Sequence, residues 1–244
     1  MSTTRVPPAA RALVEHVGAG HPLPPELRDL EGWLAASSRL RAFVDANRDK
    51  IRKKVRVATT RDQRLDVRAE LRVAALLLAD RRFELGFEAY GSGSPGPDFT
   101  ATFRAGRPFN VEVTRRQSSG VPGLERTILG KLRQLPPSRA NLLILTLPED
   151  VGEPLDLGAL MQALRSRADR RDDRWFAARG IADAASFHQG VLRLSAVVTW
   201  CERPPDASQA AMWLNPAARI GLDAAAARGL GAALGAADGT SAGP

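Results

Sequence analysis

The chain has 244 residues, 44% of them hydrophobic, which suits one globular domain with extensions or at most two small domains. Its 35 Lys and Arg residues outnumber 27 Asp and Glu residues, so the formal net charge is +8 and the isoelectric point is near 10.8. The sequence has no run of about 18 apolar residues and only one cysteine, Cys201, which excludes a membrane span and an intramolecular disulfide.

The basic balance has two interpretations. It is compatible with a polyanionic partner such as nucleic acid. It is also what the Arg- and Ala-rich composition of a high-GC bacterial proteome would produce. The few histidines are scattered without the spacing of a zinc site, and no apolar leader opens the sequence, so the cytoplasm is the expected location.

Three regions are expected along the chain. Residues 1–25 are rich in Ala, Pro and Gly and are predicted to form a flexible N-terminal arm with one short helical stretch. Residues 26–222 are predicted to form a single α/β domain that includes N-terminal helices. From 223 to 244 Ala, Gly and Ser dominate, which predicts weak helix that fades into a disordered tail.

Two helices are predicted ahead of the first strand, because apolar residues recur at three- and four-residue spacing. They cover Leu27–Asn47 and Leu65–Asp80, and the second has the strongest helical pattern of the chain. Glu70 lies on this second helix. Its simplest interpretation is an exposed helical residue.

A basic run, Asp49–Arg56, lies between these helices. Its Lys50, Lys53 and Lys54 are candidates for contacts to the phosphates of nucleic acid. The competing interpretation is a solvated helix face, which is the more common role of such a run.

Two runs of alternating polar and apolar residues flank Ala105–Gly106, and they predict a β-hairpin over Asp98–Thr114. Folding the chain at this turn brings Asp98 within about one register step of Glu112. Side chains opposite each other in such a pair have Cβ atoms roughly 4.5–5.5 Å apart. Both carboxylates are therefore expected on the same polar face of the sheet.

Two carboxylates this close repel each other unless a cation lies between them. Mg²⁺ takes one or two carboxylates together with water and phosphate oxygens, which is the chemistry of a phosphodiester-cleaving site. Simpler roles compete: Asp98 follows Gly96–Pro97 and can shape a turn, and Glu112 can be solvated on an open sheet face.

The remaining elements complete a mixed sheet covered by helices. Apolar runs of strand length alternate with amphipathic stretches after the first predicted helices. The expected strands outside the hairpin are Phe83–Tyr90, Asn141–Leu147 and Val191–Trp200, and the expected helices are Leu124–Leu135, Leu155–Arg171 and Asp173–Ala185. The short segment Met212–Arg219, which contains Trp–Leu–Asn–Pro, carries no prediction of helix or strand.

The helix with Glu70, the Pro97–Asp98 strand and the Glu112–Val113–Thr114 strand resemble the PD-(D/E)XK nuclease-like, or restriction-endonuclease-like, superfamily. The α-β-β-β-α-β order from Leu65 to Leu147 also looks like its shared core. The resemblance covers about a third of the chain. It implies a restriction-endonuclease-like mixed β-sheet core flanked by helices. It also implies Mg²⁺ or Mn²⁺ held by Asp98 and Glu112, with Glu70 as an added ligand.

The superfamily usually has a lysine two residues beyond its second acid, on the same strand face. Here that position is Thr114. Three explanations compete: Lys131 on the following helix supplies the ammonium, Arg115 or Arg116 supplies the positive charge, or cleavage has been lost and binding retained. Arginine stays protonated, so it would be a poor base.

The leading expectation is an Mg²⁺-dependent endonuclease or exonuclease that hydrolyses phosphodiester bonds of DNA. Asp98 and Glu112 would hold the metal, while Arg115, Arg116 and Lys131 would neutralise phosphate charge. One alternative is a catalytically inactive nuclease fold that binds nucleic acid or a protein partner, and another is a scaffold with no nucleic-acid role. No membrane partner is expected, and a homodimer stays open.

Overall fold

The computed structural model describes residues 6–88, 96–116, 121–148, 155–202 and 209–235. By their internal contacts, the residues form two compact units, Met1–Leu85 and Gly86–Pro244. The division differs from the expected single domain over 26–222, because the N-terminal helices make most of their contacts with one another. The mixed α/β architecture, with a sheet flanked by helices, is confirmed.

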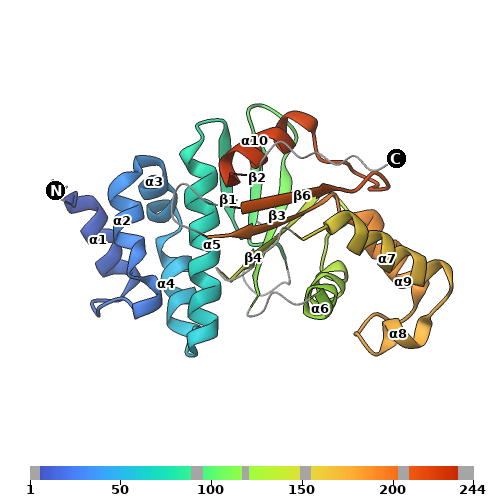
Figure 1. The fold of residues 1–244 in the computed structure, drawn as a ribbon. Helices are drawn as coiled ribbons and strands as arrows, with labels where there is room; N and C mark the ends of the chain where they lie inside the picture. Colours follow the sequence, from blue (N-terminus) through green and yellow to red (C-terminus); the bar gives the residue numbers. More distant parts are fainter. Residues whose placement is uncertain (1–5, 89–95, 117–120, 149–154, 203–208, 236–244) are drawn as a thin grey trace. The chain divides into compact units, whose positions relative to one another are not determined.

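Up to Ala79, the described elements of the first unit are helices (Figure 1). They are α1 (Pro8–Val17), the 3-10 turn η1 (Pro25–Leu27), α2 (Asp29–Ala36), α3 (Ser38–Ala46), α4 (Arg48–Val57) and α5 (Arg61–Ala79). A capping box starts α5, since Thr60 and Gln63 each accept the other's backbone N–H through their side chains. Ser37 adopts an extended conformation and caps α3, which divides the helix expected over 27–47.

The first unit takes in most of the expected N-terminal arm. In α1, Ala10, Leu13 and Val17 are buried at three- and four-residue spacing, and the helix contacts α2, α3 and α4. Residues 8–17 are thus a packed element, whose start is favoured by Pro8 at the first helical position. Residues 1–5 of that arm, like 236–244 of the expected tail, lie outside the described residues.

A six-stranded mixed sheet, ordered as in the chain, forms the core of the second unit. Its strands are β1 (Phe83–Phe87), which crosses the boundary between the units, β2 (Phe99–Phe103), β3 (Phe109–Arg115), β4 (Asn141–Leu147), β5 (Ala196–Cys201) and β6 (Gln209–Leu214). Strand β2 pairs antiparallel with β3, the β3–β4 and β4–β5 pairs are parallel, and β6 returns antiparallel to β5.

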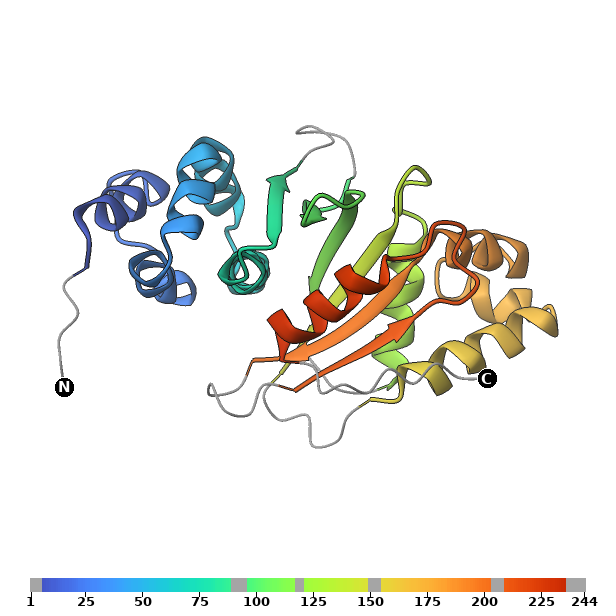
Figure 2. The same cartoon turned by 90° about the horizontal axis from the view of Figure 1, so that it is seen from above.

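Helices cover both faces of this sheet (Figures 1 and 2). The helices α6 (Val121–Leu132), α7 (Leu157–Asp169), α8 (Asp173–Ala177) and α9 (Ala184–Arg193) form a core with the β4 side chains Leu143 and Leu145. The opposite face carries α10 (Ala224–Leu234), which contacts β2 and β6. Strand β4 is buried on both faces, as its continuous apolar run predicts.

Two predicted boundaries are wrong near the end of the sheet. Residues 191–193, expected in a strand, belong to α9, where Val191 lies one turn after the buried Phe187. Strand β5 begins only at Ala196. The prediction placed its start too early because a short apolar run fits a buried helix face as well as a strand. Only the end of β6, Met212–Leu214, falls in the segment 212–219 that carries no prediction, and β6 pairs along the whole of β5.

Substitution of Gly229 tests the close contact between α10 and β2. A Cβ atom at this position would lie 2.4 Å from the Phe103 ring, so Gly229→Ala is expected to destabilise the fold by about 1–3 kcal/mol. Gly130→Ala in α6 is the matched control, since a Cβ there meets nothing within 4 Å, and it should stabilise by about 1 kcal/mol. Urea unfolding measures both, and stabilisation by Gly229→Ala would contradict the packing.

Candidate active site

Asp98 and Glu112 face each other across the β2–β3 hairpin. The strands pair Phe99 with Val111 and Thr100 with Asn110, so one further step of the same register sets Asp98 opposite Glu112. Opposed residues of an antiparallel pair project from the same face of the sheet. The turn lies where the sequence predicts it, with the Gly106 N–H donating to the Phe103 carbonyl at 3.0 Å.

The Asp98 carboxylate also has a local structural role. Its Oδ2 accepts a hydrogen bond of 2.9 Å from the backbone N–H of Val113. The Asp98 carbonyl accepts from the N–H of Glu88 at 3.0 Å. Asp98 therefore prolongs the hydrogen bonding of the hairpin beyond the first residue of β2, and its side chain is half-buried.

Glu112 lies inside β3, paired on one side with β2 and on the other with β4. Its side chain is only 13% exposed, so the interpretation of a freely solvated strand residue is wrong. Lys131 Nζ of α6, 25% exposed, lies 2.5 Å from Glu112 Oε1. A charge-assisted hydrogen bond in this partly buried setting is stronger than one on an open surface.

Arg116 fixes the helix that carries Lys131. Its Nη1 donates to the carbonyl of Gly123 at 2.6 Å and to Thr127 Oγ1 at 3.0 Å. Burial lowers the pKa of the Arg116 guanidinium. Thr127 and Lys131 are four residues apart and so share one face of α6, where one contacts Arg116 and the other contacts Glu112. Arg116 was expected to contact phosphate. In the structure its guanidinium holds the start of α6 through these two hydrogen bonds.

Alternation along β3 separates the other two candidates. Thr114 lies on the same face as Glu112, two residues further along the strand. Arg115 falls on the opposite face with Val111 and Val113. The structure therefore brings Thr114 and Lys131, but not Arg115, to the face that carries the Glu112 carboxylate.

Glu70 and the basic run belong to the first unit. Glu70 on α5 is 10% exposed and forms an ion pair with Lys54 of α4, so the interpretation of an exposed helical residue is wrong. Lys54 is therefore held within the fold, while Lys50 and Lys53 are exposed on α4. The roles of Glu70 as a metal ligand and of all three lysines in phosphate binding stay predictions. Among the described residues, no group of three or more His, Cys, Asp or Glu side chains is placed to hold a metal.

A buried amide network ties the amino ends of the parallel strands together, and sequence reasoning missed it. Asn110 Nδ2 donates to Asn141 Oδ1 at 2.9 Å, and Asn141 Nδ2 lies 2.8–3.0 Å from the carbonyl oxygens of Pro136, Arg139 and Arg193. Both asparagines are 1% exposed. The signal was present in the sequence, since a polar residue opens the continuous apolar run of β4.

Comparison of the chain with protein-family models, with curated proteins and with solved structures found no match. Within the parts of the chain that the structure describes, no helix is long and apolar enough to cross a membrane.

Proposed function

We propose that this protein is a metal-dependent nuclease that hydrolyses phosphodiester bonds of DNA on a restriction-endonuclease-like sheet. The contact between Lys131 and Glu112, with Asp98 opposite Glu112 on the same face, carries the proposal. The order α5-β1-β2-β3-α6-β4 supports it, because it agrees with the α-β-β-β-α-β core of the superfamily that the sequence resembles.

The donor set around Glu112 fits a hard divalent cation. Asp98 and Glu112 offer carboxylate oxygens on one sheet face, and Mg²⁺ or Mn²⁺ binds through one or two carboxylates while it keeps several waters. These two residues of the second unit would hold the ion. When bound, the ion supplies positive charge that stabilises the charge developing on the phosphate.

The chain's own residues would position the substrate. The Lys131 ammonium contacts Glu112, and it would take the part of the superfamily's motif lysine by stabilising negative charge on the scissile phosphate. Glu112 orients it through their hydrogen bond. Thr114 offers a hydroxyl on the same face, which can donate or accept one hydrogen bond but carries no charge.

One observation favours the alternative, an inactive nuclease fold that binds nucleic acid or a protein. Both carboxylates already interact with the chain itself, Asp98 with the N–H of Val113 and Glu112 with Lys131. With threonine in place of the motif lysine, the same arrangement can be a purely structural ion pair.

Cleavage assays separate the two functions. Wild-type protein is incubated with plasmid and with single-stranded DNA, in Mg²⁺ or Mn²⁺ against chelator. Removal of the metal or the change Glu112→Gln should each reduce the rate by about 10²–10⁴-fold, since a metal supplies several kcal/mol of transition-state stabilisation. Glu125→Gln, on the same helix as Lys131, is the matched control and should cleave normally. Cleavage that survives both the chelator and Glu112→Gln would contradict the proposal.

Salt dependence tests whether α4 contacts DNA. Each phosphate neutralised adds about −0.9 to the slope of log K against log salt on duplex DNA. Lys53→Gln should therefore make that slope shallower by about 0.9, whereas Arg11→Gln, an exposed change on α1, should leave it unchanged. Fluorescence anisotropy over a salt series measures the slope. If DNA binding is absent at low salt, or does not change with salt, the lysines of α4 do not contact DNA phosphates.

A further inference from the structure

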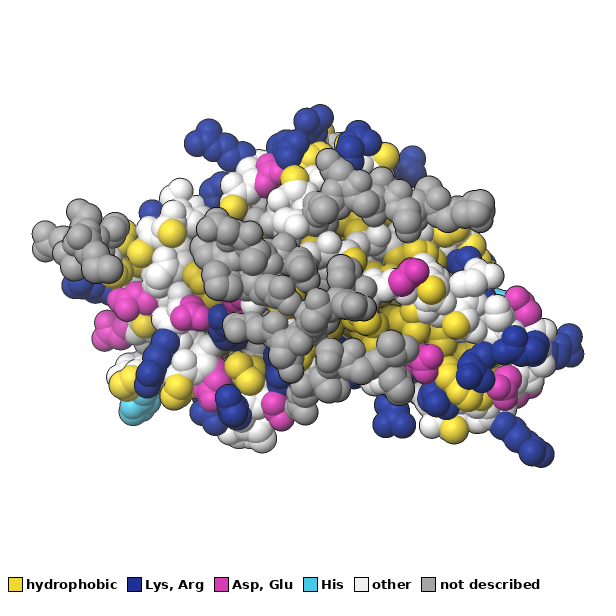
Figure 3. All heavy atoms as spheres, in the orientation of Figure 1, with side chains coloured by type: hydrophobic (Ala, Val, Ile, Leu, Met, Phe, Trp, Pro, Cys, Tyr) yellow, Lys and Arg dark blue, Asp and Glu magenta, His cyan; other side chains and the backbone are white. Residues whose placement is uncertain are grey.

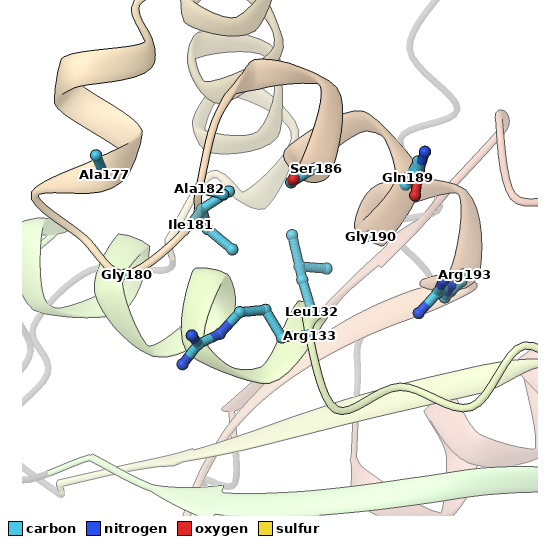
Figure 4. Close-up of a pocket in the computed structure, with 10 residues that line it drawn as sticks. All are labelled: Leu132, Arg133, Ala177, Gly180, Ile181, Ala182, Ser186, Gln189, Gly190 and Arg193. Atoms are coloured by element: carbon cyan, nitrogen blue, oxygen red, sulfur yellow. The ribbon is translucent and has the colours of Figure 1, made fainter.

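A cavity of about 530 Å³ lies in the second unit, away from the Glu112 carboxylate, on the helical layer (Figure 4). It is framed by the end of α6, by the turn that follows α8, and by α9. Its lining includes apolar, neutral polar and cationic side chains: Leu132, Ile181, Ser186, Gln189, Arg133 and Arg193.

The floor of the cavity is apolar and fixed by close helix packing. Leu132 and Ile181 are each 1% exposed and belong to the core under the sheet. Gly190 allows α9 to approach α6, because a Cβ there would lie 2.9 Å from the Cβ of Leu132. Gly180 adopts the left-handed conformation (φ +82°) at the turn after α8, which a side chain would strain. The cavity is thus built from ordered, packed elements.

The charge of the cavity is positive. Arg133 follows the last residue of α6, and Arg193 is the last residue of α9. None of the lining residues is acidic. Within the described residues, no hydrogen bond or ion pair involves either guanidinium. The nearest acid along α9, Asp183, is its N-cap and accepts from the Ser186 N–H at 2.7 Å.

The surface around α8 carries charges of both signs. Dark blue and magenta side chains lie together over this end of the second unit in Figure 3. Arg170, Arg171 and Arg174 are exposed near α8, as are Asp169 and Asp173, so the positive charge of the cavity comes from its own two arginines. Positive charge concentrated at a concave surface attracts anions and raises their local concentration.

We propose that this cavity is a binding site for an organic phosphate. Arg133 and Arg193 lie at opposite ends of the cavity (Figure 4), and together they attract a phosphomonoester, which carries about −1.5 to −2 charges at pH 7, more strongly than a carboxylate with one charge. The guanidinium is also suited to phosphate because it donates two parallel hydrogen bonds. The apolar floor would hold the organic part of the ligand, and Ser186 and Gln189 would supply neutral hydrogen bonds. The proposal does not depend on nuclease activity at Glu112.

Calorimetric titration of the full chain with phenyl phosphate tests the proposal. Saturable binding is expected, with inorganic phosphate weaker because it lacks the apolar group and benzoate weaker because it carries less charge. Arg133→Gln and Arg193→Gln should each weaken the binding of phenyl phosphate by at least about tenfold. Arg174→Gln, an exposed change outside the cavity, is the matched control and should bind as wild type does.

A second variant and a competition arm complete the experiment. Ala182→Phe should fill the cavity and abolish binding without removing a charge. The double arginine variant carries both Arg133→Gln and Arg193→Gln. If a short DNA duplex displaces phenyl phosphate, and the double arginine variant binds that duplex more weakly, the phosphate comes from the nucleic-acid backbone. If the duplex does not displace it, the ligand is a free organic phosphate. Either result supports the proposal. It is overturned if wild type shows no saturable binding up to millimolar phenyl phosphate, or if the double arginine variant and Ala182→Phe, both natively folded by circular dichroism, bind as wild type does.

Discussion

Lys131→Ala is expected to abolish Mg²⁺-dependent DNA cleavage while the chain stays folded. The change removes the ammonium that lies 2.5 Å from Glu112, and Thr114 cannot replace it because threonine has no charge. The pair is partly open to water, so its loss should cost only about 1–2 kcal/mol of folding stability. Cleavage rates and circular dichroism measured together separate the two effects.

Companion variants sharpen this result. Arg126→Ala, an exposed change on the same helix, should leave cleavage intact. Thr114→Lys in the Lys131→Ala background should restore part of the rate, because residue 114 lies on the Glu112 face of β3. Wild-type activity in Lys131→Ala would rule out a migrated lysine. Failure of wild-type protein to cleave any of a panel of DNA and RNA substrates, with Mg²⁺ or Mn²⁺, would favour the inactive fold.

Asn141→Ala is expected to cause the largest loss of stability, about 3–5 kcal/mol. The change removes the hydrogen bonds of the Asn141 side chain to the buried Asn110 amide and to nearby carbonyl oxygens. Each buried polar group that loses its hydrogen bond lowers the folding stability by about 1–3 kcal/mol. Asn110→Ala removes the hydrogen bond between the two amides but leaves Asn141 bonded to the carbonyl oxygens, so it should cost less.

Urea unfolding of the second unit, followed through its buried tryptophans, measures these changes. Gln134→Ala, an exposed change close to the network in sequence, is the control and should lie within about 0.5 kcal/mol of wild type. A loss below about 1 kcal/mol for Asn141→Ala would show that water readily replaces the missing amide.

Local patterns predicted much of this fold, because they depend on residues near in sequence. The alternation around Asp98 and Glu112 was enough to give the β2–β3 hairpin, and the unbroken apolar run gave the exact limits of β4. Strand β6 was not predicted because its six residues form a strand only by pairing with β5. An edge strand of this kind has weak intrinsic preference and is fixed by its neighbour.

The candidate site was predictable in its residues but not in their partners. The sequence suggested that Lys131 can reach Glu112, and the two side chains lie in contact. It did not suggest that Lys54 neutralises Glu70, or that Arg116 is held by Gly123 and Thr127. A charged residue carries the same signal in the sequence whether it contacts solvent, a ligand or another element of the fold.

The attachment of α6 at both ends restricts how the chain length can vary in related sequences. Thr127 and Lys131 keep their partners only while they stay in phase on one side of the helix. One residue inserted between them would rotate Lys131 by about 100° and carry its ammonium away from Glu112. The same insertion ahead of Gly123 would leave both side chains in phase, so length changes should be tolerated before α6 and excluded from its final turns.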